Sequence, residues 1–255
     1  MTEPERATTG GTSPPSSARV AGVVAAAGTA FLVLALGSLA LSRLHDHVAP
    51  IWLPNAFGMC VLLARPRREW PWLLLSFAAG MSVANGIAGD PLLRVLAFVP
   101  ANLLEIVVGA TLLGRFDHLG EDRPAVMART LLLGTLVPAL FGATLGSLLV
   151  SGSLTATFAH VWMHWFVSDL LGGVTILPVG LLFLTRGAHT RLNTRALPWA
   201  AATLAASAIA LRTLNYPYVF VSALLLVATE ALGYPLTAVT VAAERMLGRT
   251  AATAT

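Results

Sequence analysis

The sequence predicts an all-α protein, a polytopic membrane bundle of about eight transmembrane helices. Of its 255 residues, 56% are hydrophobic and only 11% are charged, and the mean hydropathy is +0.76. An average soluble domain carries roughly 25% charged residues, so this chain cannot cover a soluble surface. Disordered chains are poor in apolar residues, so the same composition excludes disorder for most of the chain. The chain is therefore expected to be embedded in a lipid bilayer.

The first helix is predicted at residues 20–41, after a tail of 18 residues rich in Ser, Thr, Pro and Gly that we expect to be disordered and cytoplasmic. The run has no charged residue and is long enough to cross a hydrocarbon core of roughly 30 Å. A signal peptide has only about 7–15 apolar residues, so this run is expected to be retained.

Seven further apolar runs follow, separated by short charged or Gly- and Pro-rich loops. They cover residues 51–64, 70–87, 92–113, 130–150, 161–184, 196–211 and 218–232. The 51–64 run is short, and a final stretch at 235–247 is too short to span. The expected organisation is a tail at 1–18, a membrane-embedded sensor-like domain at 19–247 and a polar tail at 248–255.

Arginine placement predicts the orientation. All 16 basic residues are Arg, and the net charge is +4. They gather in the N-terminal tail and in the loops after the second, fourth and sixth runs, and cytoplasmic loops of membrane proteins carry such an excess. We therefore expect an inner (plasma) membrane protein with a cytoplasmic N-terminus, and we expect no nucleic acid to bind it.

Three polar residues share one face of the 92–113 helix. At 100° per residue, Asn102 lies about 80° and Glu105 about 20° around the helix from Arg94. Ionisable groups inside a bilayer normally face the bundle interior or a wet cavity. One interpretation is the wall of an outward-open cavity, with Arg94 available to an anion. The other is a structural hydrogen-bonded seam, with Arg94 extended towards the interface. For Glu105 the interior functional role is favoured.

The 161–184 run adds Asp169, which lies about 40° around the helix from Trp165. Asp169 is expected to pair with Arg94 or to bond to Asn102. Asn55, near the outer end of the 51–64 run, either joins the same outer cavity or caps its helix. The candidate ligand or switch positions are therefore six: Asn55, Arg94, Asn102, Glu105, Trp165 and Asp169.

The sequence contains no motif for catalysis, a cofactor or a metal. P-loop, HExxH, GxSxG and paired-cysteine patterns are all absent. His160 and His164 have a metal-ligand spacing, but two ligands are too few for a site, so polar or interfacial roles are favoured. Gly142 and Gly146 form a GxxxG pattern, which indicates close packing inside the bundle rather than a dimer seam.

Four segments resemble the membrane-associated sensor domain, first class (the MASE family). These are "IWLPNAFGMCVLLARPRREWPWLLLSFAAGMSVAN" (51–85), "PANLLEIVVGATLLGRF" (100–116), "HWFVSDLLGGVTILPVGLLFL" (164–184) and "YVFVSALLLVATEALGYPLTA" (218–238). The resemblance covers about residues 20–240 in the same order. The motif positions carried over are Trp52, Pro54, Gly58, Trp70, Pro71, Asn102, Glu105, Trp165, Asp169, Gly172 and Pro178.

The resemblance implies an integral membrane input domain of bacterial signal transduction, usually fused to a histidine kinase, diguanylate cyclase or phosphatase module. Only eight residues follow Leu247, so no output domain is expected in this chain. We expect either a separate partner of the histidine kinase or diguanylate cyclase type or a truncated relative of a larger receptor. A homodimer is also compatible with the sequence.

Besides a purely structural assembly factor or a degenerate relative without activity, two functions remain open on the sequence alone. The first is a sensor subunit that detects a ligand or partner through an outer polar cavity and passes a helix rearrangement to its partner. The second is a small-molecule permease or transporter subunit, which interior carboxylates and kinking prolines would suit. Neither function makes the chain an enzyme.

Overall fold

The computed structural model describes residues 17–42, 51–114, 131–150 and 157–186. The predicted helices at 196–211 and 218–232, the stretch at 235–247 and both tails apart from residues 17 and 18 lie outside these ranges. The described part is all-helical, in agreement with the predicted fold class. Four helical stretches are long and apolar enough to cross a membrane: Ser17–Ala40, Arg67–Ala88, Leu92–Leu113 and Leu132–Val150.

The helices follow the predicted runs closely. In chain order they are α1 (Ser17–Ser42), α2 (Pro54–Leu63), the 3₁₀ turn η1 (Arg67–Glu69), α3 (Trp70–Ala88), α4 (Leu92–Leu113), the π-helix η2 (Leu132–Leu136), α6 (Val137–Val150) and α7 (Phe158–Arg186). The fifth run is thus divided, because a π-helical turn precedes α6.

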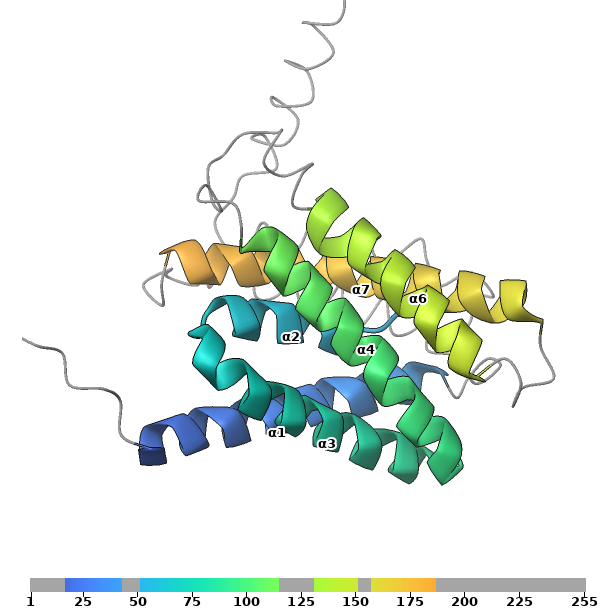
Figure 1. Ribbon diagram of the computed structural model, residues 1–255, viewed down its shortest axis with the longest axis horizontal. Coiled ribbons are helices and arrows are strands. Elements are labelled where there is room, and N and C mark those ends of the chain that lie inside the picture. Colours follow the sequence, from blue (N-terminus) through green and yellow to red (C-terminus); the bar gives the residue numbers. More distant parts are fainter. Residues whose placement is uncertain (1–16, 43–50, 115–130, 151–156, 187–255) are drawn as a thin grey trace, which may run out of the picture.

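Figure 1 shows how the helices pack. α1 and α3 lie together on one side, α6 and α7 on the other, and α4 crosses between the two pairs, with contacts to α3 and α6. The short α2 lies in the middle and contacts both α4 and α7. Any polar side chain on the inner face of α2 therefore meets residues from both of these helices.

α1 and α3 approach closely because glycines face each other across their contact. A Cβ atom on Gly80 would lie 3.2 Å from the Gly28 carbonyl oxygen. Phe31 and Phe77 stack beside this point with ring centroids 4.8 Å apart, and neither side chain is exposed. Small residues that let backbones approach are the usual basis of helix packing in membranes.

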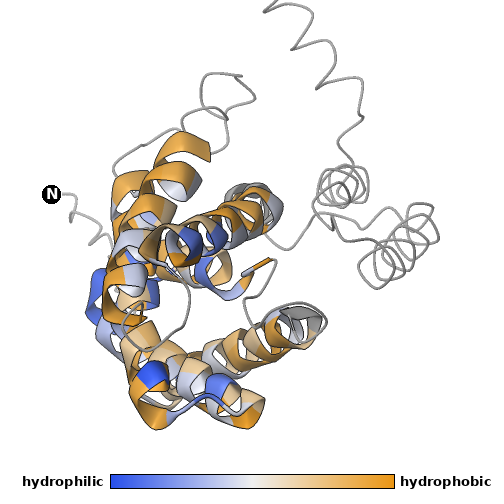
Figure 2. Ribbon diagram, turned by 90° about the vertical axis from the view of Figure 1, so that its right-hand side faces the viewer, coloured by the Kyte–Doolittle hydropathy of each residue, from blue (hydrophilic) through white to orange (hydrophobic). Residues whose placement is uncertain are grey.

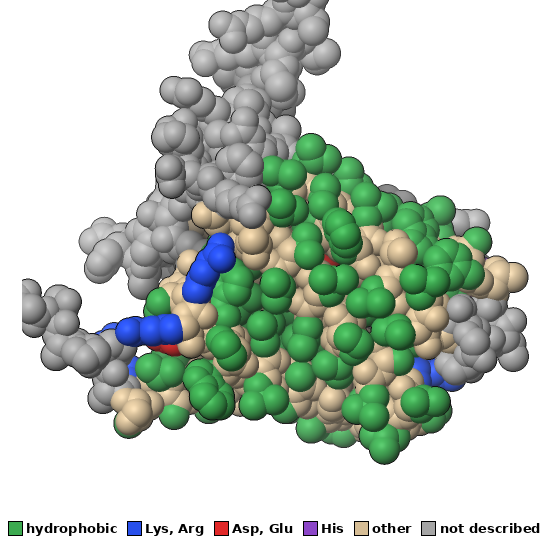
Figure 3. Space-filling view, viewed as in Figure 1, with side chains coloured by type: hydrophobic (Ala, Val, Ile, Leu, Met, Phe, Trp, Pro, Cys, Tyr) green, Lys and Arg blue, Asp and Glu red, His purple; other side chains and the backbone are tan. Residues whose placement is uncertain are grey.

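The outside of the bundle is apolar. Figure 2 shows mostly hydrophobic ribbon on the described helices, and in Figure 3 hydrophobic side chains spread across the face, with arginines near its edges. Leu75, Leu93 and Leu148 are each more than 60% exposed. A soluble monomer rarely exposes such extensive apolar surface, whereas a bilayer provides it with a matching solvent.

α2 begins inside the bundle rather than at its rim. Its 10 residues measure about 15 Å, half of a hydrocarbon core of roughly 30 Å. The residues just before it lie outside any helix and find partners on two other helices: the Trp52 N–H donates to the Ser168 carbonyl on α7 at 3.1 Å, and the Leu53 N–H donates to Ser38 Oγ on α1 at 3.3 Å. Non-helical backbone at membrane depth needs such internal partners because lipid supplies none.

Gly172 makes this junction sterically feasible, since a Cβ atom there would overlap the Trp52 carbonyl oxygen. We therefore predict that Gly172→Ala forces α2 away from α7 and lowers stability by about 1–3 kcal/mol, a typical cost of overpacking. The control is Gly37→Ala, because nothing lies within 4 Å of that Cβ position. Thermal unfolding of both variants in detergent tests this: equal midpoints would contradict the close contact.

Candidate functional site

Four buried polar side chains from three helices meet in the centre of the bundle. We call them the polar centre: Asn55 on α2, Asn102 and Glu105 on α4, and Asp169 on α7. Each is 3% exposed or less. The sequence predicted all four as candidates, and the structure places them together.

Asn55 is the hub of the hydrogen bonds. Its amide nitrogen donates to Asn102 Oδ1 at 2.8 Å and to Glu105 Oε2 at 2.7 Å. Its own carbonyl oxygen accepts the Trp52 indole N–H at 3.1 Å. This arrangement fixes the orientation of the amide, because only the NH₂ end can serve two acceptors. Of the two roles considered for Asn55, the structure places its side chain in the cluster, and the helix has no side-chain cap bond.

Asp169 completes the centre from α7. Its nearest polar neighbours are the Glu105 carboxyl and the Trp165 side chain. Neither carboxylate oxygen of Asp169 has a well-aligned hydrogen bond within the described residues, although both neighbours lie within bonding range. The expected pairing of Asp169 with Arg94 or Asn102 is therefore replaced by a contact with a second carboxyl group. Asn102 instead donates to the Phe98 carbonyl at 2.8 Å.

The helices close tightly around these groups. A Cβ on Gly142 of α6 would lie 2.6 Å from Glu105 Oε2, and one on Gly146 would meet the Trp165 ring. Trp165 also packs edge-on against Phe98 at 5.4 Å. The GxxxG pattern of α6 is thus used inside the bundle, where it admits one side chain from α4 and one from α7.

Arg94 lies apart from the centre. It pairs with Asp90 at 3.3 Å at the start of α4, and it precedes Glu105 by three helical turns, about 16 Å along the axis. The two residues share a helix face, as predicted, but they lie at different depths.

Sequence reasoning missed three polar residues near the centre, namely Ser38, Thr135 and Ser168. All three are buried. Ser38 and Ser168 serve the junction before α2 through a hydroxyl and a backbone carbonyl. Thr135 belongs to η2, and its side chain lies where a Cβ of Gly173 would be. A lone hydroxyl residue in an apolar run was the only available indication, and such residues are common in membrane helices.

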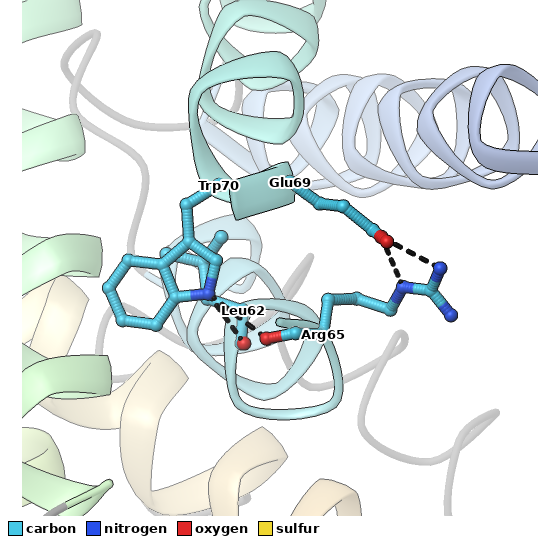
Figure 4. Close-up of polar contacts among 4 residues, drawn as sticks. All are labelled: Leu62, Arg65, Glu69 and Trp70. Atoms are coloured by element: carbon cyan, nitrogen blue, oxygen red, sulfur yellow. Dashed lines mark hydrogen bonds and ion pairs between the residues drawn. The ribbon is translucent and has the colours of Figure 1, made fainter. Parts of the chain in front are cut away.

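A second polar group joins α2 to α3 (Figure 4). Arg65 pairs with the buried Glu69 at 2.7 Å. The Trp70 indole N–H donates to the Leu62 carbonyl at 2.9 Å and to the Arg65 carbonyl at 3.2 Å. The Arg67 guanidinium packs over the same ring, 5.2 Å from its centroid. The turn therefore holds the end of α2 firmly against the start of α3.

Comparison with known families decides what kind of domain this is. The MASE1 family model matches residues 23–243. The chain belongs to the MASE1 family. The resemblance drawn from the four sequence segments is confirmed, and with it a membrane-embedded sensor domain.

One curated relative is similar along most of this MASE1 chain. It is the probable diguanylate cyclase DgcE of Escherichia coli (strain K12), 29% identical over 207 residues. The match covers 78% of this chain but only 18% of DgcE, so the chain spans less than a fifth of its relative. No solved structure matches.

The hydrogen bonds of Asn55 lead to a stability prediction. Asn55→Ala leaves Trp52 Nε1, Asn102 Oδ1 and Glu105 Oε2 each without this partner, and each buried unsatisfied group costs about 1–3 kcal/mol. We expect a loss of at least about 2 kcal/mol in unfolding measurements in detergent. Asn85→Ala is the matched control, because Asn85 is equally buried but donates only to Met81 O. An Asn85→Ala loss as large as that of Asn55→Ala would contradict the hub role.

Proposed function

We propose that this chain is the membrane input module of a bacterial signalling pathway and that its polar centre is the switch. The observation that carries the proposal is the Asn55 amide, which bonds α2 to α4 beside a carboxyl group from α7. Membership of the MASE1 family and similarity to a probable diguanylate cyclase support an input role in signalling rather than catalysis.

A rearrangement at the centre has a direct path out of the membrane. A ligand or partner that changes the contacts of Glu105 or Asp169 changes the position of α2, since Asn55 is bonded to Glu105. α2 ends at the Arg65–Trp70 turn, which fixes it to α3. In the proposed orientation, with the N-terminus in the cytoplasm, this turn lies at the cytoplasmic face of the inner membrane, within reach of a kinase- or cyclase-type partner.

The switch operates by a shift between two helix packings. A ligand shifts such an equilibrium only by its difference in affinity for the two states. Four buried polar groups that exchange hydrogen bonds inside hydrocarbon give discrete arrangements, because an intermediate with unsatisfied groups is costly. The proposed ligand contacts are Asn55, Asn102, Glu105, Trp165 and Asp169. Arg94 lies at the proposed outer end of α4, where a ligand would enter.

Transport is the second candidate, and one observation favours it. Many transporters place substrate sites where a discontinuous helix begins near the bilayer midplane, as α2 does beside two carboxyl groups. Uptake of a substrate into proteoliposomes, abolished by Asp169→Asn, would support transport over sensing.

A chimera tests the sensor function. In DgcE, this chain replaces the matched 207-residue segment, and cyclic diguanylate is measured in cells by mass spectrometry. We expect Glu105→Gln to change the output at least about fivefold, since couplings of 1–3 kcal/mol have effects of this size. Membrane insertion should remain unchanged, because glutamine keeps an acceptor for Asn55. Ser76→Ala, which removes a hydroxyl bonded only to Leu73 O on α3, is the control. Equal output from wild type and Glu105→Gln would refute the switch.

The turn between α2 and α3 is tested separately with Trp70→Phe. This change removes the indole N–H and with it the bonds to Leu62 O and Arg65 O. We expect the effect of Glu105→Gln on the chimera's output to shrink severalfold in the Trp70→Phe background. Trp72→Phe, at a tryptophan that is 60% exposed, should leave the effect at full size. If Trp70→Phe and Trp72→Phe act alike, the signal does not pass through this turn.

A further inference from the structure

The polar centre has an excess of buried acidic groups. Among the described residues, the buried Asp, Glu and Arg side chains are Glu69, Glu105 and Asp169, so all of them are acidic. Arg65 neutralises Glu69 with a 2.7 Å ion pair. Glu105 and Asp169 face each other without such a partner in the described part of the bundle. Two carboxyl groups at this depth need a compensating positive charge.

The centre also has too few hydrogen-bond donors. Both N–H groups of the Asn55 amide are committed, to Asn102 and Glu105, and Asn102 donates to Phe98 O. The Trp52 indole donates to Asn55. The Trp165 side chain is the remaining donor beside Asp169, and both oxygens of Asp169, which is 2% exposed, remain without a well-aligned hydrogen bond. Such an orphaned, buried carboxylate aimed at a second carboxyl group indicates a positively charged ligand.

One further unpartnered oxygen atom lies about one helical turn along α7 from Asp169. Gly173 lies one helical turn after Asp169 on the same face of α7, and a Cβ there would lie 3.1 Å from Thr135 Oγ1. This hydroxyl is also buried without a partner, and it is held by the π-helix η2. π-helical turns occur frequently at functional sites.

Packing restricts the size and charge of the ligand. α6 and α7 meet the centre through Gly142, Gly146, Gly172 and Gly173, each of which already touches a neighbouring helix. An organic cation would not fit between them. The pair offers two carboxyl groups with no third His, Cys, Asp or Glu side chain among the described residues, which is fewer than the six or more oxygen ligands that Ca²⁺ and Mg²⁺ prefer.

We propose that the Glu105–Asp169 pair binds a small monovalent cation, either Na⁺ or a proton, and that this cation is the ligand of the switch. The two sources share one chemistry, a single positive charge small enough to sit between two carboxyl groups. Within the described residues, no other titratable side chain acts on the pair. The segment before α2 offers Trp52, α2 offers Asn55, α4 offers Asn102, α7 offers Trp165 and α6 offers glycines, while Thr135 of η2 packs against Gly173. The signalling consequence rests on the proposed function, but binding itself does not.

The test uses the full chain in lipid nanodiscs, without any output domain. Unfolding is followed by tryptophan fluorescence in N-methylglucamine buffer, with NaCl or choline chloride added at equal ionic strength, at pH 6 and pH 8. Binding of radioactive ²²Na⁺ is measured in parallel. For a sodium site at roughly ten times Kd, we expect a saturable rise in Tm of about 3–6 °C with NaCl but not with choline chloride. For a proton site, we expect Tm to rise from pH 8 to pH 6, with no ²²Na⁺ bound.

Variants identify the residues involved. Asp169→Asn and Glu105→Gln should each remove the response to Na⁺ or to pH, and the second variant keeps the test valid if the first fails to fold. Asp90→Asn, which alters a half-buried carboxyl on the Arg94 pair, should keep the full response.

Two outcomes would overturn the cation site: no response to Na⁺ or pH in the wild type, or a response that survives in both site variants. Because no signalling output is measured, loss of the cation site would leave the chimera result standing. A chimera whose cyclic diguanylate output does not respond would likewise not contradict a cation site measured in nanodiscs.

Discussion

The need to satisfy every polar group from within the bundle governs this structure. Lipid offers neither hydrogen bonds nor counter-charges, so each buried amide, hydroxyl and carboxyl must find a partner on another helix. Asn55 meets this requirement with three hydrogen bonds that connect α2 to α4 and to the segment before α2. The same requirement applies to Asp169, which lies beside Glu105 and Trp165 without a well-aligned hydrogen bond, and this is why we propose a cation there.

The interrupted path of the chain before α2 follows from the same constraint. A non-helical segment can enter the bundle only where other helices supply acceptors for its N–H groups, and Ser38 and Ser168 do so. Gly172 then removes the side chain that would block the approach of the Trp52 carbonyl. The result places the start of a short helix, with Asn55 at its second residue, level with two carboxyl groups from other helices.

Within the described residues, hydropathy predicted the helices well, because a long apolar run has few alternatives. The run at 92–113 coincides with α4, and helical periodicity correctly put Asn102 and Glu105 on one face. Periodicity on one helix does not give depth or partners, so it grouped Arg94 with Glu105 and suggested an ion pair with Asp169. The contact between Glu105 and Asp169 depends on how α4 and α7 are placed around α6, which no local pattern encodes. The roles of the centre in ligand binding and switching remain predictions.

The π-helix before α6 has a consequence for comparing relatives. A π turn contains one more residue than an α turn, so η2 rotates everything after Leu136 by roughly 100° relative to an uninterrupted helix. Gly142 and Gly146 meet Glu105 and Trp165 only in that rotated frame. Homologues that lack the extra residue would need a single-position gap between 132 and 136 in a sequence alignment, so that both glycines stay in register. An alignment without this gap would assign the wrong face of α6 to the interior of the bundle.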